Sequence, residues 1–94
     1  MNRIIYAQKF RESMKRIAKG QYYLQKNFYS NVLSKTENLK IFPKMYPMFW
    51  EPPYRKISIH NYIILYIIEK DIIRISDIFP TKSKYSNQTY LKYR

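Results

Sequence analysis

The stretch YRKISIHNYIILYIIEK, from Tyr54 to Lys70, decides the fold. Its first part, Tyr54 to Ile59, alternates apolar and polar residues, which is typical of a strand with one face in water. His60 and Asn61 predict a two-residue turn, because asparagine tolerates a positive φ angle. The seven residues from Tyr62 to Ile68 are then all apolar or aromatic. This run is too short for a membrane span and too apolar for a strand with one wet face, so both faces require a cover.

The two-residue period continues after this stretch. Glu69 to Asp71 predicts another turn, and Ile72 to Phe79 predicts the last strand, which Pro80 ends. Residues 81–94 are basic and rich in tyrosine and carry no acidic residue, which predicts a loosely ordered tail. Strict alternation in the last strand gives one face Ile73, Ile75 and Phe79, and the other face Arg74, Ser76 and Ile78.

The N-terminal part has a helical period instead. Asn2 to Tyr6 is short and β-prone, and it predicts a first strand. An amphipathic helix should follow and end near Gly20, the only glycine. Its apolar positions are Tyr6, Phe10, Met14 and Ile17. A second helix is expected over about 21–39, with Leu24, Phe28 and Val32 at steps of four on one face.

Four prolines between Ile41 and Pro53 exclude a helix or an inner strand, so this segment is expected to be an ordered loop. The resulting order of elements is β-α-α-β-β-β. This order predicts an α+β fold in which a helix hairpin packs on one face of a small, mainly antiparallel sheet. The 94 residues are expected to form a single domain, residues 1–94.

The charge is lopsided, with 18 Lys and Arg against 6 Asp and Glu and a net charge of +12. Such an excess favours a polyanionic partner, namely nucleic acid, a ribosome or an acidic protein segment. There is no cysteine, which fits a reducing compartment, and no stretch approaches the roughly 18 apolar residues of a membrane helix. The chain is therefore expected to be cytoplasmic, with no membrane partner.

The residue types exclude most catalytic chemistry. One histidine and no cysteine predict no metal site, and no phosphate loop, carboxylate pair or marked nucleophile is present, so no cofactor is expected. RNA cleavage remains possible, because cations and phenols can stabilise the charge on a phosphorane and move protons. The residues available for it lie on the polar face of the last strands and in the tail, namely Lys56, Ser58, Arg74, Ser76, Lys82, Lys84 and Tyr85.

The segment from Tyr54 to Tyr85 resembles the C-terminal half of RelE/ParE superfamily toxins of bacterial type II toxin–antitoxin systems. The upstream half agrees in architecture, with a strand, a helix hairpin and a Phe-Pro before the loop. The matching residues are Tyr54-Arg55 at a strand start, Asn61-Tyr62 at the turn, Tyr66 in the apolar strand, Ile75 to Phe79 in the last strand and the basic segment Lys82 to Tyr85.

This resemblance implies a toxin that is neutralised by a cognate antitoxin, a small and often acidic protein. RelE-like members enter the ribosomal A site and cleave mRNA, whereas ParE-like members inhibit DNA gyrase. Because the two groups share a fold, the fold does not choose between them. The main hypothesis is a ribosome-dependent mRNA interferase. Its catalytic set would be Lys56, Arg74, Lys82 and Tyr85, and its RNA-binding residues Arg55, Lys84, Lys92 and Arg94.

Two positions depart from the RelE pattern. Ile63 stands where RelE-type nucleases often have arginine, and Pro80 to Ser83 stands where histidine or glycine followed by arginine is common. These departures favour the alternative hypothesis of a non-enzymatic gyrase inhibitor. A second alternative is a small basic nucleic-acid-binding protein or a decayed toxin.

The apolar run Tyr62 to Ile68 is also a candidate partner site. The helix hairpin covers only one face of the sheet, and an uncovered apolar face usually marks an interface. The proline-rich loop is the alternative cover. We expect an antitoxin segment to cover much of this second face, with Ile64, Tyr66 and Ile78 as its contacts.

Overall fold

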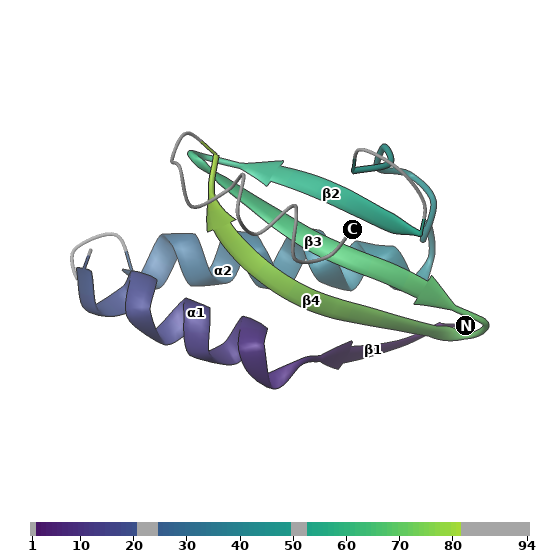
Figure 1. Ribbon diagram of the computed structural model, residues 1–94, viewed down its shortest axis with the longest axis horizontal. Helices are drawn as coiled ribbons and strands as arrows, with labels where there is room; N and C mark the ends of the chain where they lie inside the picture. The colour runs from purple at the N-terminus through teal and green to yellow at the C-terminus, as the bar shows by residue number, and fades with distance from the viewer. Residues whose placement is uncertain (1, 21–24, 50–52, 82–94) are drawn as a thin grey trace.

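The computed structural model describes residues 2–20, 25–49 and 53–81 of the 94. Two helices lie on one side of a four-stranded sheet (Figure 1). The predicted order of elements and the α+β class are confirmed. The elements are β1 (Arg3–Tyr6), α1 (Gln8–Gly20), α2 (Gln25–Glu37), the 3-10 turn η2 (Asn38–Lys40), β2 (Tyr54–Ile59), β3 (Tyr62–Glu69) and β4 (Ile72–Pro80).

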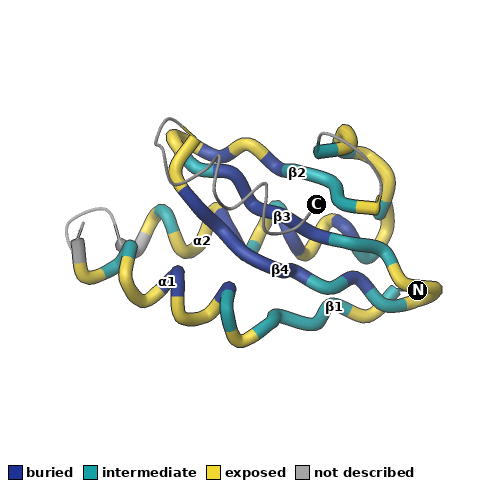
Figure 2. Tube along the Cα trace, in the orientation of Figure 1, coloured by how far each residue is buried: buried dark blue, intermediate teal, exposed yellow. Residues whose placement is uncertain are grey.

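The strands lie in the order β1-β4-β3-β2. The last three form an antiparallel meander, and β1 is parallel to β4, with Arg3 opposite Ile72 and Tyr6 opposite Ile75. The long β3 and β4 therefore occupy the middle of the sheet. Figure 2 shows that these two strands hold most of the buried residues of the sheet, as expected for strands with a neighbour on both sides.

The helices pack on the sheet through the positions that their period predicts. Phe10 and Met14 of α1 and Val32 of α2 are buried, while Ile17 and Phe28 are partly buried against them. The second helix ends at Glu37, before the predicted end at residue 39, and continues as the tighter turn η2. Leu39 of that turn is fully buried in the core. The predicted core residue Leu24 lies outside the described residues.

The helix-facing side of the sheet supplies most of the core. Its buried members come from all three strands of the meander and include Tyr66, whose hydroxyl donates a 2.8 Å hydrogen bond to the carbonyl of Pro43. Full burial of such large apolar side chains stabilises the fold by about 1.5–3 kcal/mol each. The sheet residues of this cluster are Ile57, Ile59, Ile64, Tyr66, Ile73, Ile75 and Ile78.

The opposite face of the sheet has a small core of its own. Ile63, Leu65 and Phe79 are buried there, and Phe49 and Tyr54 pack against them. The Phe49 and Phe79 rings meet edge to face, with their centroids 6.0 Å apart. The proline-rich loop thus covers part of the second face of β3, which was the alternative to a wholly open patch. Within the described residues, this answers how a strand can be apolar on both sides.

A β-bulge in β4 breaks the predicted alternation. Leu65 pairs with Asp77 and its neighbour Tyr66 pairs with Ile75, so Ser76 has no counterpart in the register. Beyond the bulge the alternation is reversed. The prediction that Phe79 shares a face with Ile73 and Ile75 is therefore wrong, because one extra residue turns Ile78 toward the helices and Phe79 away from them.

The meander turns at two pairs of residues, His60-Asn61 and Lys70-Asp71. The predicted turn positions are confirmed, but the residue with positive φ in the first turn is His60 (φ 51°) and not Asn61. Lys70 has φ 56° in the second turn. Both turns place a side chain with a Cβ in the left-handed region, which is unfavourable for residues other than glycine or asparagine.

Candidate functional site

Two of the predicted catalytic cations lie on the sheet, on the face that points away from the helices. Lys56 and Arg74 lie on the outer face, because their neighbours Ile57, Ile73 and Ile75 point to the helices. Lys56 is opposite Leu65, and Arg74 is opposite Ile67, so the two cations are separated by β3 and offset by two residues. Strand spacing and rise place their Cα atoms about 12 Å apart.

Arg74 is engaged by a carboxylate. Its Nε lies 3.1 Å from Glu69 Oε1 and donates a hydrogen bond to it, with both side chains close to half exposed. An exposed ion pair of this kind contributes little to stability, about 0–1 kcal/mol. It nevertheless engages the Nε–H, one of the five guanidinium donors, and places a carboxylate beside Arg74 that would repel an approaching phosphate.

Arg55 holds the proline-rich loop against the sheet. One of its guanidinium nitrogens donates to the carbonyl of Tyr46 at 2.7 Å and lies 3.5 Å from the carbonyl of Lys44. The backbone supports the same contact, because Lys56 N–H donates to the Pro47 carbonyl and Met48 forms a bridge to Arg55. Arg55 is therefore a loop anchor in this structure. These contacts also cover part of the outer edge of β2, which would otherwise be open to another strand.

The remaining predicted site residues fall into two groups. Lys82, Lys84, Tyr85, Lys92 and Arg94 lie outside the described residues, so the full predicted catalytic set is not brought together within the described part of the chain. Ile64, Tyr66 and Ile78 belong to the helix-facing core and are at most 2 % exposed. Their burial contradicts their assignment to an open antitoxin face, because the helices and not a partner cover them.

A buried polar contact connects α1 to the bulge of β4. Ser13 Oγ donates to Asp77 Oδ1 at 2.8 Å, and the Ile78 N–H donates to the same oxygen at 2.8 Å. Lys9 Nζ lies 3.5 Å from the other oxygen, Oδ2. Asp77 is 1 % exposed, so these partners compensate for taking a carboxylate out of water. Sequence reasoning assigned Asp77 no role, because its partner Ser13 is 64 positions away in the chain and the two meet only in the fold.

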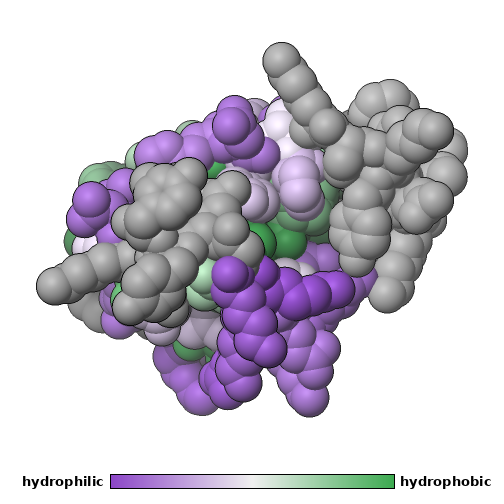
Figure 3. All heavy atoms as spheres, turned by 90° about the vertical axis from the view of Figure 1, so that its left-hand side faces the viewer, coloured by the Kyte–Doolittle hydropathy of each residue, from purple (hydrophilic) through white to green (hydrophobic). Residues whose placement is uncertain are grey.

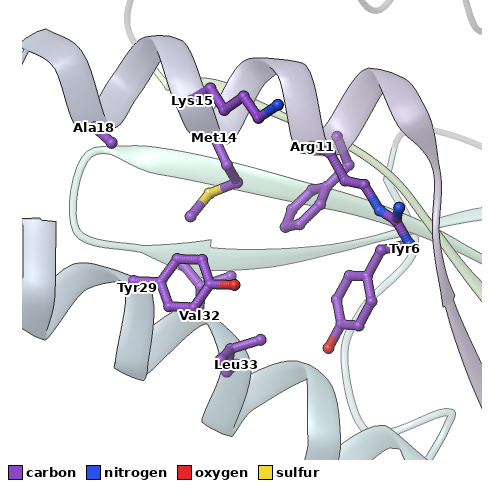
Figure 4. Close-up of a pocket in the computed structure, with 9 residues that line it drawn as sticks. Tyr6, Arg11, Met14, Lys15, Ala18, Tyr29, Val32 and Leu33 are labelled. Atoms are coloured by element: carbon purple, nitrogen blue, oxygen red, sulfur yellow. The ribbon is translucent and has the colours of Figure 1, made fainter.

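A groove of about 470 Å³ runs between the two helices. Met14 of α1 points across the hollow toward Tyr29 and Val32 of α2, whereas Lys15 lies along α1 and Arg11 extends toward Tyr6 (Figure 4). Tyr29 is 53 % exposed although it is a large aromatic residue. The sequence gives one signal for this surface. Tyr29 is a large aromatic residue that lies next to the core position Phe28, outside the predicted apolar stripe of the helix. The full lining is Tyr6, Phe10, Arg11, Met14, Lys15, Ala18, Tyr29, Val32 and Leu33.

Two tyrosine phenols are desolvated by the fold. Burial raises the pKa of Tyr6, whose hydroxyl shares a 2.7 Å hydrogen bond with Thr36 Oγ1, and burial likewise raises the pKa of Tyr66. Raised pKa values keep both phenols neutral near pH 7. Neither is prepared to act as a phenolate base, so their present roles are packing and hydrogen bonding.

A comparison with protein-family models identifies the family. The model described as ParE toxin of type II toxin-antitoxin system, parDE, matches residues 4–85. The chain belongs to this ParE toxin family. A solved structure entitled "Chromosomal ParDE TA system from P. aeruginosa" superposes with a TM-score of 0.71 and 11 % sequence identity. The match covers 87 % of this chain and 98 % of that one, which shows a shared fold. The search of curated proteins finds no match.

The ParE assignment agrees with the resemblance inferred from residues 54–85. The family match begins at Ile4, the second residue of β1, and so includes both helices and the strands β2 to β4. Among the described residues there is no group of three or more metal-ligand side chains, and no helix of the described part is long and apolar enough to cross a membrane.

Proposed function

We propose that this ParE-family chain is the toxin of a type II toxin–antitoxin pair and acts by binding DNA gyrase. Family membership supports the class, and a ParE toxin carries the expectation of gyrase inhibition. The observation that favours this mode over RNA cleavage is the engagement of the candidate cations. Arg74 is paired with Glu69, and Arg55 is committed to the loop carbonyls.

The chemistry of RNA cleavage explains why this engagement matters. Charge stabilisation requires donors that converge within about 3 Å of the developing oxyanion. On the outer face, the surface between Lys56 and Arg74 is formed by Leu65 and Ile67, and Leu65 is fully buried beside Phe49 and Tyr54. The apolar strand β3 therefore separates the two cations, at the position where a nuclease would need polar groups that bind the phosphate.

The ribosome-dependent mRNA interferase is the second candidate. Lys56 is only half buried on the outer face, and the net charge of +12 suits a polyanionic target. Under this hypothesis Lys56 and Arg74 would act together with Lys82 and Tyr85 of the tail. RNA would then have to bind Arg74 beside the Glu69 carboxylate or displace it.

One pair of assays separates the two candidates. Purified chain is added to gyrase with relaxed plasmid, and in parallel to a translating ribosome extract in which A-site cleavage of mRNA is mapped by primer extension. The proposal expects loss of supercoiling at micromolar toxin and intact mRNA. Cleaved mRNA with normal supercoiling would instead establish the interferase.

A further inference from the structure

A second pocket lies at the end of the molecule where α2 begins and β2 turns into β3. Its volume is about 610 Å³, which is in the range of pockets that hold small molecules. Figure 3 views this end and shows hydrophobic residues at its middle, with hydrophilic residues above and below them. We call it the turn pocket, and its lining comes from α2 between Asn27 and Asn31, from His60, Asn61 and Tyr62, and from Pro80.

Three aromatic rings cluster beside the turn pocket. Phe28 of α2 is at the centre of the cluster, with the ring centroid of Tyr62 5.2 Å away and that of His60 5.8 Å away. Phe28 and Tyr62 are partly buried against the core, which holds their rings in place. His60 is exposed and belongs to the turn, where its φ angle is 51°. Such a cluster offers aromatic faces on which another planar ring can stack.

Asparagine side chains supply the hydrogen-bonding groups of the turn pocket. Asn27 and Asn31 are four residues apart and therefore lie on the same flank of α2, while Asn61 comes from the turn. All three are exposed. Each carboxamide has two N–H donors and a carbonyl acceptor, the combination that matches the edge of a nucleobase. Among the described residues that line the pocket, none is Asp, Glu, Lys or Arg, which suits a neutral group.

We propose that the turn pocket binds an unpaired adenine base, which stacks on the aromatic cluster and pairs at its edge with the asparagines. Adenine is the base whose N6 and N7 atoms form a bidentate pair with an asparagine carboxamide. The base is unpaired, because in a duplex its faces are stacked on its neighbours and cannot contact a protein ring. This inference goes beyond the proposed function, since the turn pocket has no part in the choice between gyrase and mRNA.

The charge of the chain favours a nucleotide over other planar or stacking ligands. A net charge of +12 attracts the phosphates attached to the base, while the neutral lining of the pocket suits the base itself. A neutral sugar would stack on a ring and bond to asparagine, but it would gain nothing from this charge. A phenylalanine side chain of a protein would also stack, but it would leave the three carboxamides without partners.

The first experiment measures the binding of fluorescein-labelled DNA hexamers to the purified chain by fluorescence anisotropy. Hexamers of deoxyadenylate, of thymidylate and of abasic nucleotides carry the same number of phosphates, so the electrostatic attraction is matched. We expect the adenylate hexamer to bind at least about tenfold more tightly than the abasic hexamer and about threefold more tightly than the thymidylate hexamer. Equal binding of the adenylate and abasic hexamers would overturn the inference, and equal binding of adenylate and thymidylate would overturn the choice of adenine.

Free adenosine monophosphate, AMP, separates the two sources of an adenine base. AMP that binds as tightly as the adenylate hexamer assigns the pocket to a mononucleotide, whereas tighter binding of the hexamer assigns it to a single strand with its further phosphates. Both results support the inference, and binding of neither probe contradicts it. NMR spectra locate the contact, because the ring-proton signals of His60 and Tyr62 should shift when a base stacks beside them. Binding that leaves these signals unchanged would place the ligand elsewhere and overturn the inference.

Two glycine variants form a matched pair. H60G and K70G each replace the first residue of a two-residue turn, where φ is positive, so glycine fits both backbones. Only H60G removes a ring from the turn pocket, and it leaves the net charge of +12, counted with neutral histidine, unchanged. We expect H60G to weaken binding of the adenylate hexamer about tenfold, and K70G to weaken it less than about threefold although it removes a positive charge. Equal losses would overturn the inference.

The asparagines have a test of their own. Asn31 is exposed, so N31A should unfold at the same denaturant concentration as the parent. Because it removes a carboxamide and leaves the rings in place, N31A should lower the preference for the adenylate over the thymidylate hexamer to less than about half of its parent value. An unchanged preference in N31A, and likewise in N27A and N61A, would contradict recognition of the adenine edge by these side chains.

Discussion

Ser13 Oγ donates a 2.8 Å hydrogen bond to Asp77 Oδ1, and this contact connects α1 to the bulge in the central strand β4. The two residues are 64 positions apart in the chain. The same carboxylate oxygen accepts the Ile78 N–H, so a single buried group fixes the position of a helix and the backbone of a strand beyond its irregular residue. The polar contact therefore connects helix α1 to the central strand at the bulge.

Removing this carboxylate should destabilise the fold strongly. D77A leaves the Ser13 hydroxyl and the Ile78 N–H buried without an acceptor, which predicts a loss of about 2–4 kcal/mol in the free energy of unfolding. D77N keeps an oxygen acceptor in place and loses only the ion pair to Lys9, so it should cost less than half as much. Denaturant unfolding followed by circular dichroism measures both. Equal effects of the two variants would show that charge, and not the acceptor, is what the site requires.

Arg55 should control the order of the proline-rich loop. R55A removes the 2.7 Å bond to the Tyr46 carbonyl and is expected to cost about 1–2 kcal/mol and to expose the loop to proteases. The neighbouring variant K56A is the control, since the Lys56 contribution to loop contact is its backbone N–H, which alanine retains. Limited proteolysis with mass spectrometry locates the cuts. Equal protease sensitivity of R55A and K56A would refute the anchor role of Arg55.

Replacing Lys70 with glycine should stabilise the protein. Lys70 has φ 56°, and a residue with a Cβ is disfavoured there while glycine is not. K70G is expected to raise the free energy of unfolding by about 0.5–1 kcal/mol, after allowance for the greater freedom of glycine in the unfolded chain. K70A removes the same charge without relieving the backbone and should stay within about 0.5 kcal/mol of the parent. A K70A gain as large as that of K70G would assign the effect to charge instead.

The buried phenols predict a loss of stability in alkali. Burial raises the pKa of Tyr66, so above about pH 10 the unfolded chain releases this proton more readily than the folded one. The contribution is fully present below about pH 10 and is lost as the pH rises through the folded pKa. Y66F keeps the ring but cannot ionise. Its unfolding free energy, compared with that of the parent at about pH 8 and about pH 11, should fall less steeply between the two.

The order of the elements could be predicted because it depends on local periods. Helical spacing from Phe10 to Ile17 and alternation from Tyr54 to Ile59 each specify an element from its own residues. The bulge at Ser76 could not be predicted, because the extra residue is identified only by pairing with Tyr66 and Leu65 on another strand. This tertiary feature reversed the faces of Ile78 and Phe79.

The candidate site was predicted less well for a related reason. Residue type indicated that Arg55 and Arg74 were available to bind RNA. In the fold, Arg55 donates to a loop carbonyl and Arg74 pairs with Glu69. Neither partner can be identified from the sequence alone. The groove between α1 and α2 likewise combines residues from two helices. Helical periodicity predicts which residues face the core, whereas the gap between two helices depends on how far apart they pack.

The most direct test of the central claim is a supercoiling assay with purified gyrase, relaxed plasmid and this chain at micromolar concentration. The account predicts that supercoiling is inhibited, that K56A and R74A inhibit as well as the parent, and that ribosome-bound mRNA stays intact under matched conditions. Normal supercoiling together with A-site cleavage that K56A and R74A abolish would contradict it.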